Sequence, residues 1–178
     1  MGYRFLTALL LVFAIGCGQA EGKVEDFGEK SSQEVVDTDA NLAPDFTLKD
    51  LEGNDWTLSG FRGSVVIVAF WAPWCPHCVY EIPLLDSLHT VFADSGLVVV
   101  GIGIDRVSAL RGTVDEKGLR YTILVDENGS VAKQYGVQGI PTTFIIDREG
   151  KVAYYHVGYH PSMNEGIVQE VKDVLSRR

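Results

Sequence analysis

The stretch VVIVAFWAPWCPHC, residues 65–78, joins an apolar run to a pair of cysteines and is the strongest indication of the fold. The run from Val65 to Phe70 is rich in β-branched residues, as expected for a strand that is buried on both faces. After it, apolar residues at helical spacing predict a helix from about Pro76 to Phe92. Cys75 and Cys78 therefore lie where a buried strand passes into a helix.

On either side of this stretch, strand-like and helix-like segments alternate along the chain. A hairpin is predicted to join Phe46–Leu48 to Trp56–Leu58. Further strands are expected at Leu97–Ile104, Thr122–Val125, Thr142–Ile146 and Val152–His156, and helices at Val107–Lys117, Ser130–Tyr135 and around Ile167–Leu175. This order predicts an α/β domain from about residue 41 to 178, with a central sheet covered by helices on both faces.

The spacing of Cys75 and Cys78 suits reversible disulfide chemistry. A cysteine at a helix N-terminus faces free backbone N–H groups and the positive end of the helix dipole, which stabilise a thiolate. Pro76 fits the first helical turn because its missing N–H would have had no partner there. A protonated His77 would stabilise a neighbouring thiolate further. Stabilising the reduced form makes the disulfide a stronger oxidant. Of the two sulfurs, Cys75 should be the more exposed.

Other uses of the cysteine pair require features that the sequence lacks. A zinc site would need a second Cys/His pair, and no other cysteine follows residue 78. Covalent haem attachment would need a histidine directly after the second cysteine, where Val79 stands. A structural pair of buried thiols remains an alternative. We expect no bound metal and no cofactor beyond the Cys75–Cys78 disulfide, and His89, His156 and His160 are assigned no role.

Two motifs carry a family resemblance. The stretch from Phe70 to Cys78 resembles a thioredoxin-fold active site, and Gly139-Ile140-Pro141-Thr142-Thr143-Phe144 resembles the second signature of that family, a loop with a cis proline. The opening Ala43-Pro44-Asp45-Phe46, the hairpin after it and the extra helix and strand near 107–125 are closer to the membrane-anchored TlpA/ResA-like branch. The resemblance implies a thioredoxin-like fold with a mixed sheet, an N-terminal β-hairpin and a central extra β/α element.

The resemblance also implies roles for individual residues. Cys75 would attack a substrate disulfide and Cys78 would resolve the mixed disulfide. Ile140 and Pro141 would hold the substrate strand, since proline offers no backbone donor. Trp74 would help to shape the active-site turn.

One departure from thioredoxins points to an acid. Thioredoxins carry a buried aspartate two residues before the active-site tryptophan, where this chain has Ala69. ResA-like proteins instead have a glutamate three residues after the second cysteine, and Glu81 stands there. A half-buried carboxylate at this place could accept the proton of Cys78 as that sulfur attacks. The alternative is a solvated glutamate in a first helical turn.

The N-terminus has the pattern of a targeting segment. Arg4 is the only charge before Glu21, and the weakly polar or apolar run Phe5–Ile15 is too short to span a bilayer, which is typical of a signal peptide over residues 1–16. The residues Ala14-Ile15-Gly16-Cys17 resemble a lipoprotein cleavage site, which implies that Cys17 is lipidated; plain secretion is the alternative. Residues 17–40 are polar and acidic and predict a flexible tether.

The charge and the motifs together restrict the classes of function that this chain can have. The chain has 15 Lys and Arg residues against 24 Asp and Glu residues, which argues against a nucleic-acid partner. We expect an extracytoplasmic, membrane-anchored thiol–disulfide oxidoreductase of the bacterial cell envelope that acts on protein cysteines. By resemblance it would be a reductase, for example of apocytochrome c, supplied by a membrane dithiol carrier. Three alternatives stay open. One is an oxidising DsbA-like enzyme, which the Pro-His dipeptide favours. The others are a peroxiredoxin, although Ala72 replaces the threonine that this family needs, and a copper metallochaperone.

Overall fold

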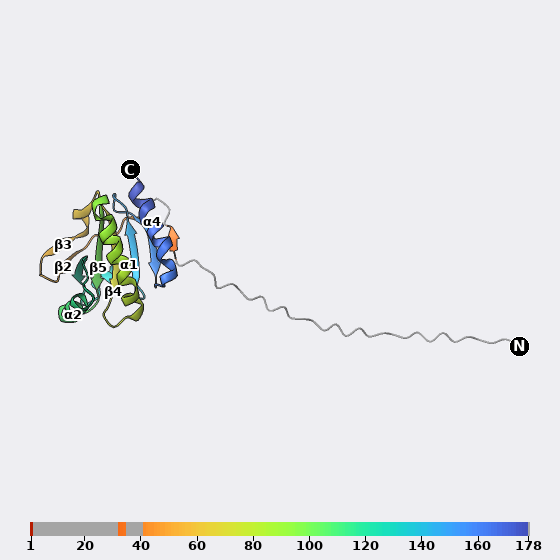
Figure 1. Ribbon diagram of the computed structural model, residues 1–178, viewed down its shortest axis with the longest axis horizontal. Helices are drawn as coiled ribbons and strands as arrows, with labels where there is room; N and C mark the ends of the chain where they lie inside the picture. The colour runs from red at the N-terminus through yellow and green to blue at the C-terminus, as the bar shows by residue number, and fades with distance from the viewer. Residues whose placement is uncertain (2–31, 35–40, 178) are drawn as a thin grey trace.

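The protein is described by a computed structural model that covers residue 1, residues 32–34 and residues 41–177 (Figure 1). The expected signal peptide, apart from Met1, and the expected lipidation site Cys17 lie outside the described residues. Residues 41–177 form an α/β domain, and residues 32–34 add a short strand to it.

A single mixed sheet runs through the domain, with the strand order β1-β8-β7-β4-β5-β6-β2-β3. Strands β4, β5 and β6 are parallel to one another, and all other neighbours are antiparallel. The strands are β1 (Ser32–Glu34), β2 (Thr47–Asp50), β3 (Asp55–Thr57), β4 (Val65–Trp71), β5 (Leu97–Gly103), β6 (Thr122–Val125), β7 (Thr142–Ile146) and β8 (Val152–Val157). The α/β class, the N-terminal hairpin and the extra β/α element are therefore confirmed.

The helices gather on one face of the sheet more than the sequence predicted. Helices α1 (Pro76–Phe92), α2 (Val107–Lys117) and α4 (Asn164–Ser176) contribute to the larger apolar cluster, and Figure 1 shows α1 and α4 across the same side of the sheet. The opposite face is covered by the five-residue helix α3 (Ser130–Gln134) and by Ala43, Phe46 and Leu58 from the N-terminal segment. The expected helices are therefore present on both faces, but the second face has only the short helix α3. Loop side chains and a short helix are enough to bury that face.

Strand β4 lies at the centre of the sheet and places the cysteines. All seven of its residues are buried, which explains the uninterrupted apolar run. Ile67, Ala69 and Trp71 face the cluster that contains α1, whereas Val68 and Phe70 face the other. The chain leaves the sheet after Trp71 and begins α1 at Pro76, so the cysteine pair lies just beyond the end of a fully buried strand.

A short strand lies within the segment that was expected to be a tether. Ser32–Glu34 forms β1 and pairs antiparallel with β8 at the edge of the sheet. Edge pairing uses backbone hydrogen bonds and requires no apolar side-chain pattern, so hydrophobic periodicity could not reveal it. The pairing covers the otherwise free edge of β8.

Candidate active site

The two domain cysteines form a disulfide at the start of α1. Their Cα atoms are 5.3 Å apart. Cys75 is the N-cap residue of α1, and its Sγ accepts a hydrogen bond from the backbone N–H of Cys78 at 3.2 Å. Cys75 is 5% exposed and Cys78 1% exposed, so Cys75 is the sulfur nearer to solvent, as predicted. A thiolate on Cys75 would receive the same N–H, which stabilises its charge.

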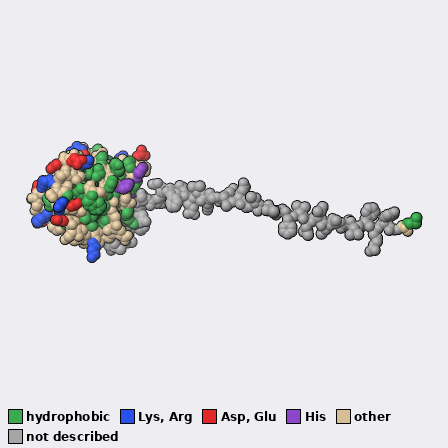
Figure 2. All heavy atoms as spheres, turned by 90° about the horizontal axis from the view of Figure 1, so that it is seen from below, with side chains coloured by type: hydrophobic (Ala, Val, Ile, Leu, Met, Phe, Trp, Pro, Cys, Tyr) green, Lys and Arg blue, Asp and Glu red, His purple; other side chains and the backbone are tan. Residues whose placement is uncertain are grey.

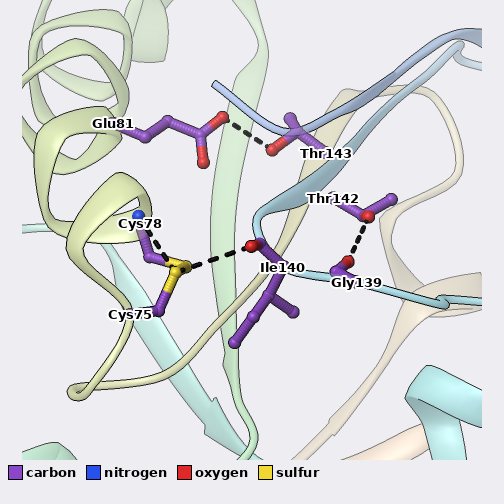
Figure 3. Close-up of a disulfide and its surroundings, with 7 residues drawn as sticks. All are labelled: Cys75, Cys78, Glu81, Gly139, Ile140, Thr142 and Thr143. Atoms are coloured by element: carbon purple, nitrogen blue, oxygen red, sulfur yellow. Dashed lines mark hydrogen bonds between the residues drawn. A yellow bond between two sulfur atoms is a disulfide. The ribbon is translucent and has the colours of Figure 1, made fainter. Parts of the chain in front are cut away.

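The proline loop lies directly against the disulfide (Figure 3). It connects to the start of β7, which is the antiparallel neighbour of β4 in the sheet. The Ile140–Pro141 peptide bond is cis, and the carbonyl oxygen of Ile140 lies 3.6 Å from Sγ of Cys75. An oxidised sulfur has no proton to donate, so this contact can become a hydrogen bond only when Cys75 is a thiol. The hydroxyl of Thr142 donates to the carbonyl oxygen of Gly139 at 2.7 Å and closes the loop.

A small apolar groove borders the cysteine turn. Trp74 is 67% exposed and forms one wall of this groove, and Ile140 contributes to another. The groove has a volume of about 180 Å³ and is also lined by Ile104, Ala132, Val137, Gln138 and Gly139. One extended peptide could therefore contact this apolar groove and the Sγ atom of Cys75 at the same time.

Glu81 is buried one helical turn after Cys78. It is 2% exposed, and its Oε1 accepts a hydrogen bond from the hydroxyl of Thr143 at 2.8 Å (Figure 3). Burial raises the pKa of Glu81 to about 7, although the Thr143 hydrogen bond and the charge of His156 act in the opposite direction. The structure therefore supports a buried acid rather than a solvated helix residue. A group with this pKa can take or give a proton near neutral pH.

The remaining residues of the turn are more open to water. Pro76 occupies the first turn of α1, as its chemistry suggests, and both Pro76 and His77 are exposed. The His77 ring makes an edge-on contact with Tyr80, with ring centroids 6.5 Å apart. Solvent screens the charge of an exposed imidazole, so its influence on the sulfurs is weaker than the sequence implied.

His156 and its partner Glu170 were not predicted from the sequence to belong to this site. His156 was assigned no role, yet it is 2% exposed, and its Nε2 lies 2.6 Å from Oε2 of Glu170. Glu170 occupies the stripe of α4 that also carries the buried residues Ile167, Val171 and Val174. A charged residue at such a position is the available signal, because an unpaired carboxylate would be costly there.

Metal ligation has no evident site in the part of the chain that the structure describes. There, no group of three or more His, Cys, Asp or Glu side chains could hold an ion. The chemistry that the geometry offers is instead that of a dithiol, a buried acid and a docking loop.

Comparison with known proteins bears on this site. The AhpC/TSA family matches residues 40–155, a range that contains Cys75, Cys78, Glu81 and the proline loop. The thiol-disulfide oxidoreductase ResA of Geobacillus thermodenitrificans is 35% identical over 150 residues, which cover 84% of this chain and 82% of the relative. The chain belongs to the AhpC/TSA family, as a ResA-like thiol–disulfide oxidoreductase.

Solved structures agree with this assignment. A crystal structure named as a thiol:disulfide interchange protein DsbE from Chlorobium tepidum is 34% identical, with a TM-score of 0.74, over 76% of this chain and 96% of that one. A secreted disulfide oxidoreductase from Mycobacterium tuberculosis is 25% identical, with a TM-score of 0.65, over 76% of this chain and 99% of that one. The thioredoxin-like fold and the enzyme class that the sequence predicted are therefore confirmed.

Proposed function

We propose that this oxidoreductase works as an extracytoplasmic reductase of protein disulfides, with Cys75 as the attacking sulfur. The observation that carries the proposal is the placement of the Cys75–Cys78 disulfide between the N-terminus of α1 and the Ile140–Pro141 loop. No cofactor is required, because the two cysteines themselves carry the electron pair.

The reaction needs two exchange steps. The Cys75 thiolate attacks one sulfur of a substrate disulfide, which forms a mixed disulfide and releases the other substrate sulfur as a thiolate. Cys78 then loses its proton to the Glu81 carboxylate and attacks Cys75. The Cys75–Cys78 bond forms, the bond between Cys75 and the substrate breaks, and the substrate leaves fully reduced. The enzyme is now oxidised and must receive two electrons from a dithiol donor.

The balance of charges supports the reducing direction. His77, which would stabilise a thiolate and favour an oxidant, is exposed and screened. Glu81 is buried, so its negative charge acts on the Cys78 side of the pair through a medium of low dielectric constant. A carboxylate disfavours a nearby thiolate, which destabilises the reduced pair and makes it the better electron donor.

Substrate and donor follow from the chemistry and from the family resemblance. The groove beside Trp74 and Ile140 suits an extended protein segment that carries cysteines. Because the chain resembles ResA-like proteins, we propose apocytochrome c as such a substrate and a membrane dithiol protein as the electron donor.

The location rests on the N-terminal sequence and on one relative. We propose that residues 1–16 are removed and that Cys17 is lipidated, so that the domain is held at the extracytoplasmic side of a bacterial membrane. The M. tuberculosis relative is described as secreted, which agrees with an extracytoplasmic site. Among the described residues, no helix has the length and apolar character needed to cross a bilayer.

A thiol oxidase is the second candidate, favoured by the hydrogen bond from the Cys78 N–H to Cys75 Sγ. To separate the two directions, the reduced protein is mixed with a disulfide-bonded two-cysteine peptide, and the oxidised protein with the same peptide as a dithiol. A reductase oxidises itself rapidly in the first mixture and remains oxidised in the second. The reverse pattern would establish the oxidase.

Trapping tests the order of attack. The Cys78→Ser chain should accumulate a mixed disulfide with an oxidised protein substrate, because Cys75 can attack but nothing resolves the product. Cys75→Ser is the matched control and should trap almost none. Equal trapping by both variants would remove the assignment of Cys75 as the nucleophile.

A further inference from the structure

Glu81 on α1, His156 on β8 and Glu170 on α4 are linked through contacts on one face of the sheet. Thr143 on β7 donates its hydroxyl to Glu81 on α1, and Thr143 lies directly opposite His156 on β8 in the antiparallel register. Opposed residues in such a pair project from the same face, with Cβ atoms about 4.5–5.5 Å apart. His156 is therefore the cross-strand neighbour of the residue that holds Glu81.

The His156 ring is itself held from the other side. Its Nε2 lies 2.6 Å from Oε2 of Glu170 on α4, and this contact is an ion pair whenever the ring is protonated. The side chains of His156 and Glu170 are only 3% and 15% exposed. The second ring nitrogen, Nδ1, is buried without a hydrogen-bond partner among the described residues. A charge on this ring is thus poorly screened and fixed in position.

Other titratable groups that face Glu81 do not supply a positive charge. Tyr121, just before β6, and Tyr159, just after β8, are buried, and burial together with the negative charge of Glu81 raises the pKa of both hydroxyls. Both tyrosines stay neutral at physiological pH. Among the charges that act on Glu81, His156 lowers its pKa, against the larger effect of burial.

We propose that His156, held by Glu170, is a positioning residue that controls whether Glu81 is a carboxylate or a neutral acid during disulfide exchange. This inference rests on the proposed proton transfer from Cys78 to Glu81. That step requires an ionised Glu81 beforehand and leaves it protonated afterwards. A positive His156 favours the ionised state, so the pair prepares Glu81 to accept the proton near neutral pH.

The direct test is a titration of the Glu81 carboxyl group by ¹³C NMR in the oxidised full chain, with the signal assigned from its loss in Glu81→Gln. In His156→Gln the midpoint of that titration should move to higher pH by about one unit, because an opposite charge has been removed. Asp173→Asn is the matched control. Asp173 also joins α4 to β8, through the Tyr154 hydroxyl, but its side chain is 46% exposed. An unchanged midpoint in His156→Gln, or an equal shift in Asp173→Asn, would overturn the inference.

A reciprocal measurement keeps the test valid if His156→Gln does not fold. Coupling between two sites is mutual, so Glu81→Gln must move the titration of the His156 ring signals to lower pH by the same amount. An unmoved His156 titration would overturn the inference as well. Neither readout depends on activity. The pH dependence of disulfide exchange in Glu81→Gln tests the proposed function separately. If it equals that of the wild type while the Glu81 and His156 midpoints both move, the proposed proton transfer is wrong. The charge coupling between His156 and Glu81 is then still supported.

Discussion

At the scale of single residues, the site depends on the carboxyl group of Glu81, which is buried away from water. The spacing of three residues after Cys78 put Glu81 on the correct helix, but sequence alone could not decide between a solvated and a buried glutamate. The burial of Glu81 depends on β7 and β8, which are distant from α1 in the chain but lie next to Glu81 in the fold. Thr143 and His156 come from these strands, so the surroundings of Glu81 could be known only after the fold.

Burial of Glu81 predicts a pH-dependent cost in stability. The pKa is raised from 4.5 to about 7 in the folded protein, so the protonated form is favoured there. The unfolded chain releases this proton near pH 4.5 and the folded chain near pH 7, so stability is lost as the pH rises between these values. The loss amounts to about 3 kcal/mol and then levels off.

Urea unfolding of the oxidised chain between about pH 4 and pH 9 measures this effect against Glu81→Gln, which cannot ionise and can still accept the Thr143 hydrogen bond. The difference in free energy of unfolding, wild type minus variant, should fall by about 3 kcal/mol as the pH rises. A difference that stays constant with pH would contradict a raised pKa.

At the scale of elements, β-strands and helices were predictable because their apolar periods are strong. Helix α1 begins at Pro76 and ends at Phe92, as the spacing predicted, and β4 extends one residue beyond the predicted end. Coverage of the second face was not predictable in this way. It depends on aromatic contacts such as Phe46 with Trp56, and Trp56 with Phe61, between short elements that have no helical apolar period.

Close packing of α2 on β5 predicts a sensitive glycine. A Cβ atom added at Gly103 would lie 2.3 Å from Cδ2 of Leu110, which is fully buried. Gly103→Ala should therefore displace α2 and lower the free energy of unfolding by about 1–3 kcal/mol. Thermal or urea denaturation measures this loss.

Gly112 provides the control within the same helix. It is exposed, and an added Cβ meets nothing within 4 Å. Gly112→Ala should raise the free energy of unfolding by about 0.5–1 kcal/mol, because alanine costs less backbone entropy in a helix. Equal effects of the two substitutions would show that α2 is not packed on β5 as described.

At the scale of the whole molecule, the sulfurs lie just beyond the end of the central strand β4. One edge of the same sheet carries β1, the strand that follows the expected anchor. Figure 2 shows charged side chains of both signs scattered over one face of the domain, with apolar side chains gathered between them. No basic face appears in that view of the described residues, which agrees with the acidic balance of the whole sequence.

The proposed anchor makes a prediction at this scale. Cys17→Ser cannot be lipidated, so the variant should move from the detergent phase to the aqueous phase in Triton X-114 partitioning of bacterial extracts. The Cys75→Ser chain keeps Cys17 and should partition as the wild type does. Unchanged detergent partitioning of Cys17→Ser would exclude the lipid anchor.

The reduction potential of the Cys75/Cys78 couple decides whether the protein donates or accepts electrons, and it is measured by equilibration of the full chain with dithiothreitol or glutathione at about pH 7. The burial of Glu81 and the exposure of His77 together predict a reducing couple, near the value of about −270 mV that is typical of thioredoxin. A value near the DsbA figure of about −120 mV would contradict a reductase, because the pair would then accept electrons from substrate thiols rather than donate them.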